Sequence, residues 1–111
     1  MSDTTETVVI NHSEFPLPPQ VREWPGIRVV ECPREGEIPP GIDGEVVLTR
    51  TDGGPNLADL LGRSPRWVHT VGTGVDSFPF NALQGQKLTC SRGISGELIG
   101  EWVFAQLLAA A

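Results

Sequence analysis

The sequence has no run of basic residues and no apolar run long enough to cross a bilayer. Its 14 Asp and Glu outnumber its 8 Lys and Arg, for a formal net charge of -6. Nucleic-acid binding depends on cations that neutralise phosphates, so this balance argues against a nucleic-acid partner and against an anionic membrane surface. A membrane-spanning helix needs about 20 apolar residues. We therefore expect neither nucleic acid nor membrane as a partner.

Cysteine is scarce, with Cys32 and Cys90 far apart in the chain. The first ten residues are polar and acidic and contain no Lys or Arg, unlike a secretory signal peptide. We predict reduced cysteines in a cytoplasmic protein, with a disulfide in an oxidising compartment as the alternative. The two histidines, His12 and His69, are too few and too poorly accompanied to predict a metal site.

Short β-rich runs recur along a chain of 111 residues, a length that suits one modest domain. The runs that predict strands cover residues 7–10, 27–30, 45–49, 67–71 and 87–90. The central runs are nearly continuous in apolar or β-branched residues, which is typical of a parallel sheet covered on both faces. In the run 67–71, alternation places Trp67, His69 and Val71 on one face and predicts a packed histidine.

The segments between the strands leave little room for helices. Residues 55–62 predict a short helix with Pro near its start and Gly at its end. Residues 78–83 predict one or two helical turns. Four prolines between positions 11 and 25 forbid a long first crossover helix, because each proline removes an amide donor and restricts its predecessor. The Pro39-Pro40-Gly41 stretch limits the second crossover in the same way.

Residues 96–111 form the strongest helical pattern in the sequence. Apolar residues cover well over half of the helix circumference, and Glu97, Glu101 and Gln106 are its few polar positions. Such a helix needs apolar neighbours on more than one side. It also runs to Ala111 without a Gly cap or a basic last turn. We interpret it as one half of an interface in a truncated protein; docking on the sheet or dimerisation is the alternative.

The stretch with the clearest chemistry is the glycine turn after the fourth predicted strand. Gly72 and Gly74 allow unusual backbone dihedrals, so successive amides can form a partly positive nest for a carboxylate or phosphate. In open α/β sheets, ligands bind beyond the carboxyl ends of the strands. Arg50 follows the third strand at the same kind of position and could pair with an anion; a solvated arginine is the alternative.

Two other interpretations of the glycine turn compete with anion binding. Gly-rich turns often serve chain reversal alone. The spacing Gly72, Gly74, Ser77 also resembles a dinucleotide fingerprint, but the third glycine is absent and Phe78-Pro79 interrupts the place where a phosphate-binding helix should begin. We therefore disfavour nicotinamide binding at this turn.

Three motifs in register resemble the D-isomer-specific 2-hydroxyacid dehydrogenases, the family that includes phosphoglycerate dehydrogenase. They are the strand and G-x-G-V-D turn of residues 67–76, the turn of residues 90–93, and residues 99–102 near the start of an apolar helix. Residues 45–61 also look like the family's third strand and following helix. Departures are the proline-rich first crossover, Arg92 where proline is usual, and Gly100 in place of alanine.

This resemblance implies a flavodoxin-like α/β substrate domain with the strand order 2-1-3-4-5 over residues 1–95. Residues 96–111 would then lead into an NAD- or NADP-binding Rossmann domain that is missing here. The implied substrate is a small D-2-hydroxy or 2-keto acid, whose carboxylate is held by the amides of Thr73 and Gly74, with Arg50 as a secondary contact for a substrate anion.

The resemblance also implies that the chain is inactive alone. The family's nicotinamide site and its catalytic arginine, acidic residue and histidine lie downstream of the matched region, and hydride transfer requires a bound cofactor placed against the substrate. Oligomeric state stays open, because the family dimerises mostly through the other domain. The alternative is a stand-alone flavodoxin-like module that binds an anion or a protein without catalysis.

Overall fold

The computed structural model describes residues 6–111. Residues 1–5, part of the N-terminal segment from which a cytoplasmic location was predicted, lie outside the described residues. The elements, in chain order, are β1 (Thr7–Asn11), α1 (Pro19–Arg22), β2 (Ile27–Glu31), β3 (Val46–Arg50), α2 (Leu57–Leu61), β4 (Trp67–Val71), the 3₁₀ turn η1 (Phe80–Ala82), β5 (Lys87–Cys90) and α3 (Gly96–Ala110).

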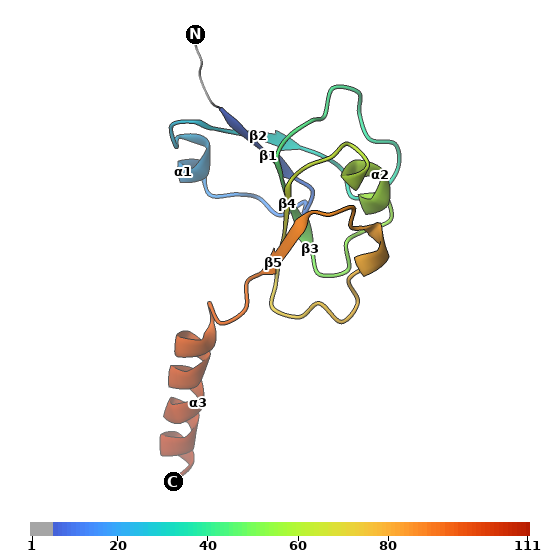
Figure 1. The fold of residues 1–111 in the computed structure, drawn as a ribbon. Coiled ribbons are helices and arrows are strands. Elements are labelled where there is room, and N and C mark those ends of the chain that lie inside the picture. The colour runs from blue at the N-terminus through green and yellow to red at the C-terminus, as the bar shows by residue number, and fades with distance from the viewer. Residues whose placement is uncertain (1–5) are drawn as a thin grey trace.

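The five strands form one parallel sheet in the order β2-β1-β3-β4-β5 (Figure 1). This is the predicted order, and the α/β arrangement is flavodoxin-like. Each strand also begins and ends within one residue of its predicted range. β-Branched and apolar runs predict strands well here, because branched side chains favour extended backbone.

One face of the sheet carries the core, and we call it the closed face. Helix α2 buries Leu57, Leu60 and Leu61 in a cluster that includes Val47 from β3 and Val68 from β4. The β2–β3 connection and the segment before η1 complete this layer with Cys32, Ile38 and Phe78. Much of the core on this face therefore packs against the apolar side of one short helix, α2.

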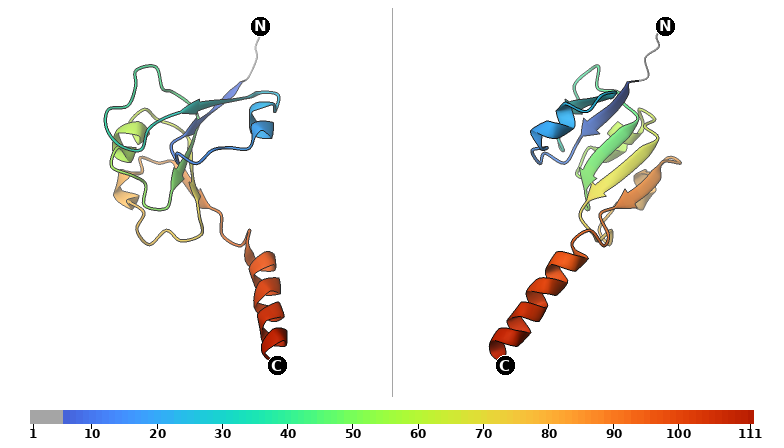
Figure 2. Two further views of the ribbon diagram at one scale, coloured as in Figure 1. Left: turned by 180° about the vertical axis from the view of Figure 1, so that it is seen from behind. Right: turned by 90° about the vertical axis from the view of Figure 1, so that its left-hand side faces the viewer.

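The other face of the sheet is largely uncovered, and we call it the open face. Figure 2 shows only α1 in front of it, beside β1 and β2. On β4, Trp67 is 42% exposed and Val71 39% exposed. The prediction of a sheet covered on both faces is therefore wrong for this face. Covering both faces of a parallel sheet needs crossover helices on each side, and the described chain supplies only α1 here.

Prolines explain why so little helix covers the sheet. Helix α1 has four residues and starts with Pro19 at its first position, where a missing amide is tolerated. No helix forms between β2 and β3, where Pro39 and Pro40 interrupt the backbone. Both outcomes were predicted. The predicted helix at 55–62 forms over Leu57–Leu61, and the predicted turn near 78–83 is η1.

Helix α3 projects away from the sheet and contacts no other helix or strand (Figures 1 and 2). The Cα radius of gyration is 17.0 Å, whereas a compact domain of this length has about 13 Å. The sequence predicted that this apolar helix needs neighbours on more than one side; within residues 6–111 it has none and is exposed along its whole length. The helix begins at Gly96.

Candidate functional site

The loops with the most polar side chains lie at one edge of the sheet. They follow the carboxyl ends of β1, β3, β4 and β5. Parallel strands all end at the same edge, so loops that are distant in sequence become neighbours there. In the register, Arg50 at the end of β3 pairs with Val71 at the end of β4. The amide of Ser91, just after β5, donates to the carbonyl of Gly72 at 2.7 Å.

The glycine turn after β4 is open to solvent at this edge. Thr73 and Gly74 are both exposed. Within residues 6–111, neither of their amides donates a hydrogen bond to the protein. Gly72 has φ +144°, a region that L side chains rarely adopt. The turn therefore presents two unpaired, accessible amides, as an anion-binding nest requires.

Alanine at Gly72 is expected to destabilise the fold by about 1–3 kcal/mol. Besides the strained φ, the added Cβ would lie 2.8 Å from Cγ2 of Thr51. Gly74→Ala is the matched control, since an added Cβ there meets nothing within 4 Å and its φ is not positive. Urea unfolding of both variants measures the difference. Equal stability of the two would contradict the described turn.

Arg50 lies one strand away from the turn and is held in place by its neighbours. Its Nε donates to the carbonyl of Ser13 at 2.7 Å. Its guanidinium carbon lies 4.3 Å from the centroid of the Phe15 ring, a cation–π contact. The terminal guanidinium nitrogens make no hydrogen bond or ion pair to the described part of the chain. Arg50 is thus a cation held in place by its neighbours, and its terminal guanidinium nitrogens can donate hydrogen bonds to a ligand.

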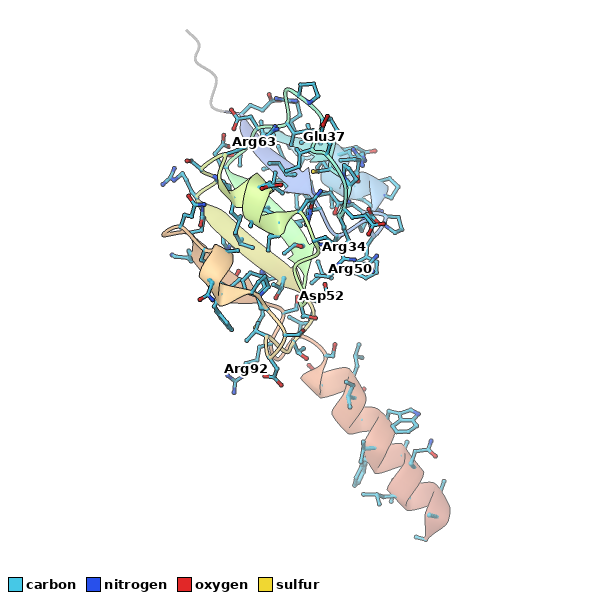
Figure 3. All side chains as sticks on the ribbon, turned by 90° about the vertical axis from the view of Figure 1, so that its right-hand side faces the viewer. Arg34, Glu37, Arg50, Asp52, Arg63 and Arg92 are labelled. Atoms are coloured by element: carbon cyan, nitrogen blue, oxygen red, sulfur yellow. The ribbon has the colours of Figure 1, made fainter. Side chains whose placement is uncertain are left out.

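Figure 3 shows Arg50, Arg34 and Asp52 near the carboxyl edge, while Arg92 lies beyond it on the β5–α3 connection. Arg34 is paired with Asp52, so its charge is already balanced. Arg92 is exposed and points away from Arg50. Among these cations, Arg50 is therefore the one best placed to contact an anion at the edge.

A buried polar network lies beneath this edge and supports the loops. His12, fully buried just after β1, contacts the Thr49 hydroxyl through Nδ1 at 2.8 Å and Asn56 Oδ1 through Nε2 at 2.5 Å. The Asn56 amide nitrogen donates to the carbonyls of Pro33 and Gly36. The network therefore links β1, β3, the start of α2 and the β2–β3 connection.

The hydrogen bonds of Asn56 determine the tautomer of His12. Since the Asn56 nitrogen donates to two carbonyls, its Oδ1 must accept, and His12 Nε2 carries the proton. Nδ1 is then an acceptor 2.8 Å from the Thr49 hydroxyl, whose one proton is shared between Nδ1 and the carbonyl of Gly53 at 3.1 Å. Burial lowers the pKa of His12, and the positive charge of Arg34 acts in the same direction. A neutral histidine fits this network as a structural element.

His69 lies on the open face, where alternation predicted it beside Trp67. The Thr89 hydroxyl accepts from Trp67 Nε1 at 2.7 Å and contacts His69 Nδ1 at 2.7 Å. His69 Nε2 reaches the Ser91 hydroxyl at 3.1 Å. The side chain is half-buried and hydrogen-bonded but has no helix packed over it, so the prediction of a packed histidine is met only in part.

Sequence reasoning missed the Asn11-His12-Ser13 stretch, in which all three residues are buried at the end of β1. Asn11 bonds Glu31 and the carbonyl of Phe15, and Ser13 supplies the carbonyl that holds Arg50. The sequence does contain a pattern that points to this stretch. Polar residues that directly follow a buried parallel strand lie at the edge of the sheet where ligands bind. The apolar run by itself predicted a strand that ends at Ile10.

A hollow of about 610 Å³ lies at the opposite edge, where the strands begin. Glu6 and Glu45 line it together with Arg66 and Lys87. Two carboxylates and the absence of a glycine turn make it a poor anion site. Within residues 6–111, no cluster of three or more His, Cys, Asp or Glu could hold a metal ion.

The described helices also include none with both the length and the apolar character that a membrane crossing requires. Cys32 and Cys90 are both free thiols, and burial raises the pKa of Cys32. Neither thiol lies in the glycine turn. They therefore add no chemistry to the candidate site.

The fold and this edge define a flavodoxin-like α/β domain whose candidate site is a solvent-exposed glycine turn beside a positioned arginine. Comparison of the chain with models of protein families, with curated proteins and with solved structures found no match.

Proposed function

We propose that this chain is the substrate-binding part of an NAD(P)-dependent D-2-hydroxyacid dehydrogenase of cytoplasmic location. The observation that supports this most is the turn after β4, where Thr73 and Gly74 are exposed and their amides make no hydrogen bond to the described residues 6–111. The resemblance of residues 67–76 to the family's G-x-G-V-D turn assigns these amides to the substrate carboxylate. Arg50 is the secondary contact, for a further anionic group of a 2-hydroxy or 2-keto acid.

The described residues do not fit a nicotinamide dinucleotide. Such a site needs a glycine turn that leads directly into a helix, whose N-terminus binds the pyrophosphate. Here the turn at Gly72 leads through Pro79 to the three-residue turn η1. On this proposal, hydride transfer requires a cofactor domain in addition to this one, and residues 6–111 contribute binding and orientation of the substrate.

The proposal is tested by removing one backbone donor. Thr73→Pro deletes the amide, whereas the matched Thr73→Ala deletes only the side chain. The Thr73 amide makes no hydrogen bond to residues 6–111, so its loss leaves the native pairing intact. We expect pyruvate to shift the amide NMR signals of positions 73 and 74 both in the wild-type chain and in the Thr73→Ala variant. In Thr73→Pro, affinity should fall at least tenfold.

Acetone, which lacks the carboxylate, is the ligand control and should shift neither signal. If pyruvate moves other amides instead, or if Thr73→Pro binds as well as Thr73→Ala, the carboxylate assignment is wrong. If the chain alone oxidises a hydroxy acid when NAD is added, the proposal that a separate domain must supply the cofactor site is wrong.

A second candidate function is a non-catalytic interaction module. The exposure of every residue of α3 favours it, because a helix with so much apolar surface needs a neighbour. Pyruvate binding at Thr73 and Gly74 would decide for the dehydrogenase part. Absence of that binding would favour the module.

A further inference from the structure

A series of hydrogen bonds on the open face leads from β4 to the glycine turn. The Trp67 indole donates to the Thr89 hydroxyl at 2.7 Å, and that hydroxyl lies 2.7 Å from Nδ1 of His69. Nε2 of His69 lies 3.1 Å from the Ser91 hydroxyl. The backbone amide of Ser91 donates to the carbonyl of Gly72 at 2.7 Å. A single residue, Ser91, therefore connects the imidazole of His69 to the turn.

The partners of His69 assign its neutral tautomer. The Thr89 hydroxyl accepts the indole proton, so its own proton goes to Nδ1. Nε2 then carries the ring proton and donates to Ser91, whose hydroxyl reaches the carbonyl of Thr70 at 3.4 Å. A second proton on Nδ1 keeps the contact with Thr89, because a hydroxyl oxygen can accept two N–H donors. The imidazolium can therefore form without movement of the ring.

His69 is the group beside the turn whose charge depends on pH near neutrality. The flanking strands and loops carry four charged side chains, Arg50, Asp76, Lys87 and Arg92. The groove residues that share the open face with His69 include no acid or base. Carboxylates, lysines and arginines do not ordinarily titrate between pH 5.5 and 8, whereas histidine does. Within residues 6–111, His69 forms no ion pair, so its protonation adds a positive charge that no carboxylate there balances by contact.

We propose that His69 is a further residue of the carboxylate site, and that its imidazolium strengthens the binding of a carboxylate at the amides of Thr73 and Gly74. The amides supply only partial charges, so a full positive charge close to them adds attraction that they lack. The His69 side chain is half-buried, and solvent screens such a charge less than an exposed one. The inference rests on the proposed function. A 2-keto acid should then bind more tightly as the pH falls through the titration of His69.

Calorimetric titration with pyruvate at pH 5.5 and pH 8 tests the inference. We expect the wild-type affinity to be about three to ten times higher at pH 5.5. His69→Gln keeps a polar side chain without a titrating group, and its affinity should be the same at both pH values. Lys87→Gln is the matched control: it removes a charge from the far end of β5 and should retain the full pH dependence. Added salt should reduce the wild-type difference.

NMR supplies a second measurement that needs no ligand. Between pH 5.5 and 7, the amide signals of positions 73 and 74 should move with pH in wild type and stay fixed in His69→Gln. Protonation of His12 cannot produce the expected result, because burial disfavours its charged form and its protonation would weaken the fold at low pH.

The outcomes separate this inference from the proposed function. Binding at the turn is the binding that Thr73→Pro weakens. If such binding has equal affinity at both pH values, or if its pH dependence survives in His69→Gln, the inference is wrong and the proposed function stands. If pyruvate does not bind at the turn at either pH, the proposed function fails and the inference fails with it.

Discussion

Replacing Asn56 by alanine is expected to lower the free energy of unfolding by about 3 kcal/mol. The side chain is 4% exposed and takes part in three hydrogen bonds, to His12 Nε2 and to the carbonyls of Pro33 and Gly36. Alanine would leave the buried imidazole N–H without a partner and would remove the amide donor from two carbonyls. Each unsatisfied buried group costs about 1–3 kcal/mol, and small domains have only about 5–15 kcal/mol in total.

Asn81→Ala is the control for this variant, because Asn81 lies exposed on η1 and its side chain forms no hydrogen bond among the described residues. Its free energy of unfolding should stay within about 0.5 kcal/mol of wild type. Urea denaturation followed by circular dichroism measures both variants. A loss below 1 kcal/mol for Asn56→Ala would mean that the buried network does not hold the loops together.

The second large effect is a fall in stability as the pH drops below the ordinary histidine pKa of 6.5. Burial lowers the pKa of His12 in the folded chain, so in this pH range the unfolded chain binds a proton that the folded chain does not. The contribution of His12 is therefore fully present above pH 6.5 and is lost as the pH falls toward the folded-state pKa. The slope is at most about 1.4 kcal/mol per pH unit.

Urea midpoints between pH 7.5 and 5 give this slope. His12→Gln removes the titrating group, so its stability should vary less with pH than that of wild type, even though the variant is less stable throughout. Asn81→Ala, which changes no titrating group, is the control and should retain the wild-type slope. Identical slopes for wild type and His12→Gln would exclude His12 as the source of the pH dependence.

Much of the sheet could be predicted from residue type alone. The five β-rich runs matched the strands, since branched apolar side chains favour extended backbone and burial between neighbours. Prolines 16, 18 and 19 likewise predicted a short first crossover. Both are local effects, determined by a residue and its immediate neighbours in the chain.

The candidate site was predicted less completely. Gly72 and Gly74 predicted the turn because glycine has wide backbone freedom. Arg50 was predicted as an anion contact because it follows a strand. Sequence reasoning could not assign the supports of Arg50, namely the carbonyl of Ser13 and the ring of Phe15, since both lie more than 30 positions away in the chain. Their contribution depends on β1 and β3 lying side by side.

By itself, the sequence determined the strands, the short crossovers, the apolar helix and the glycine turn, because each follows from dihedral preference, side-chain shape or periodicity over a few residues. Only the tertiary structure decided that His12 is buried against Thr49 and Asn56, that one face of the sheet is covered only by the short helix α1 within residues 6–111, and that α3 lies apart from the body. These features depend on which distant segments meet, and pairing between distant segments leaves no periodic pattern in a single chain.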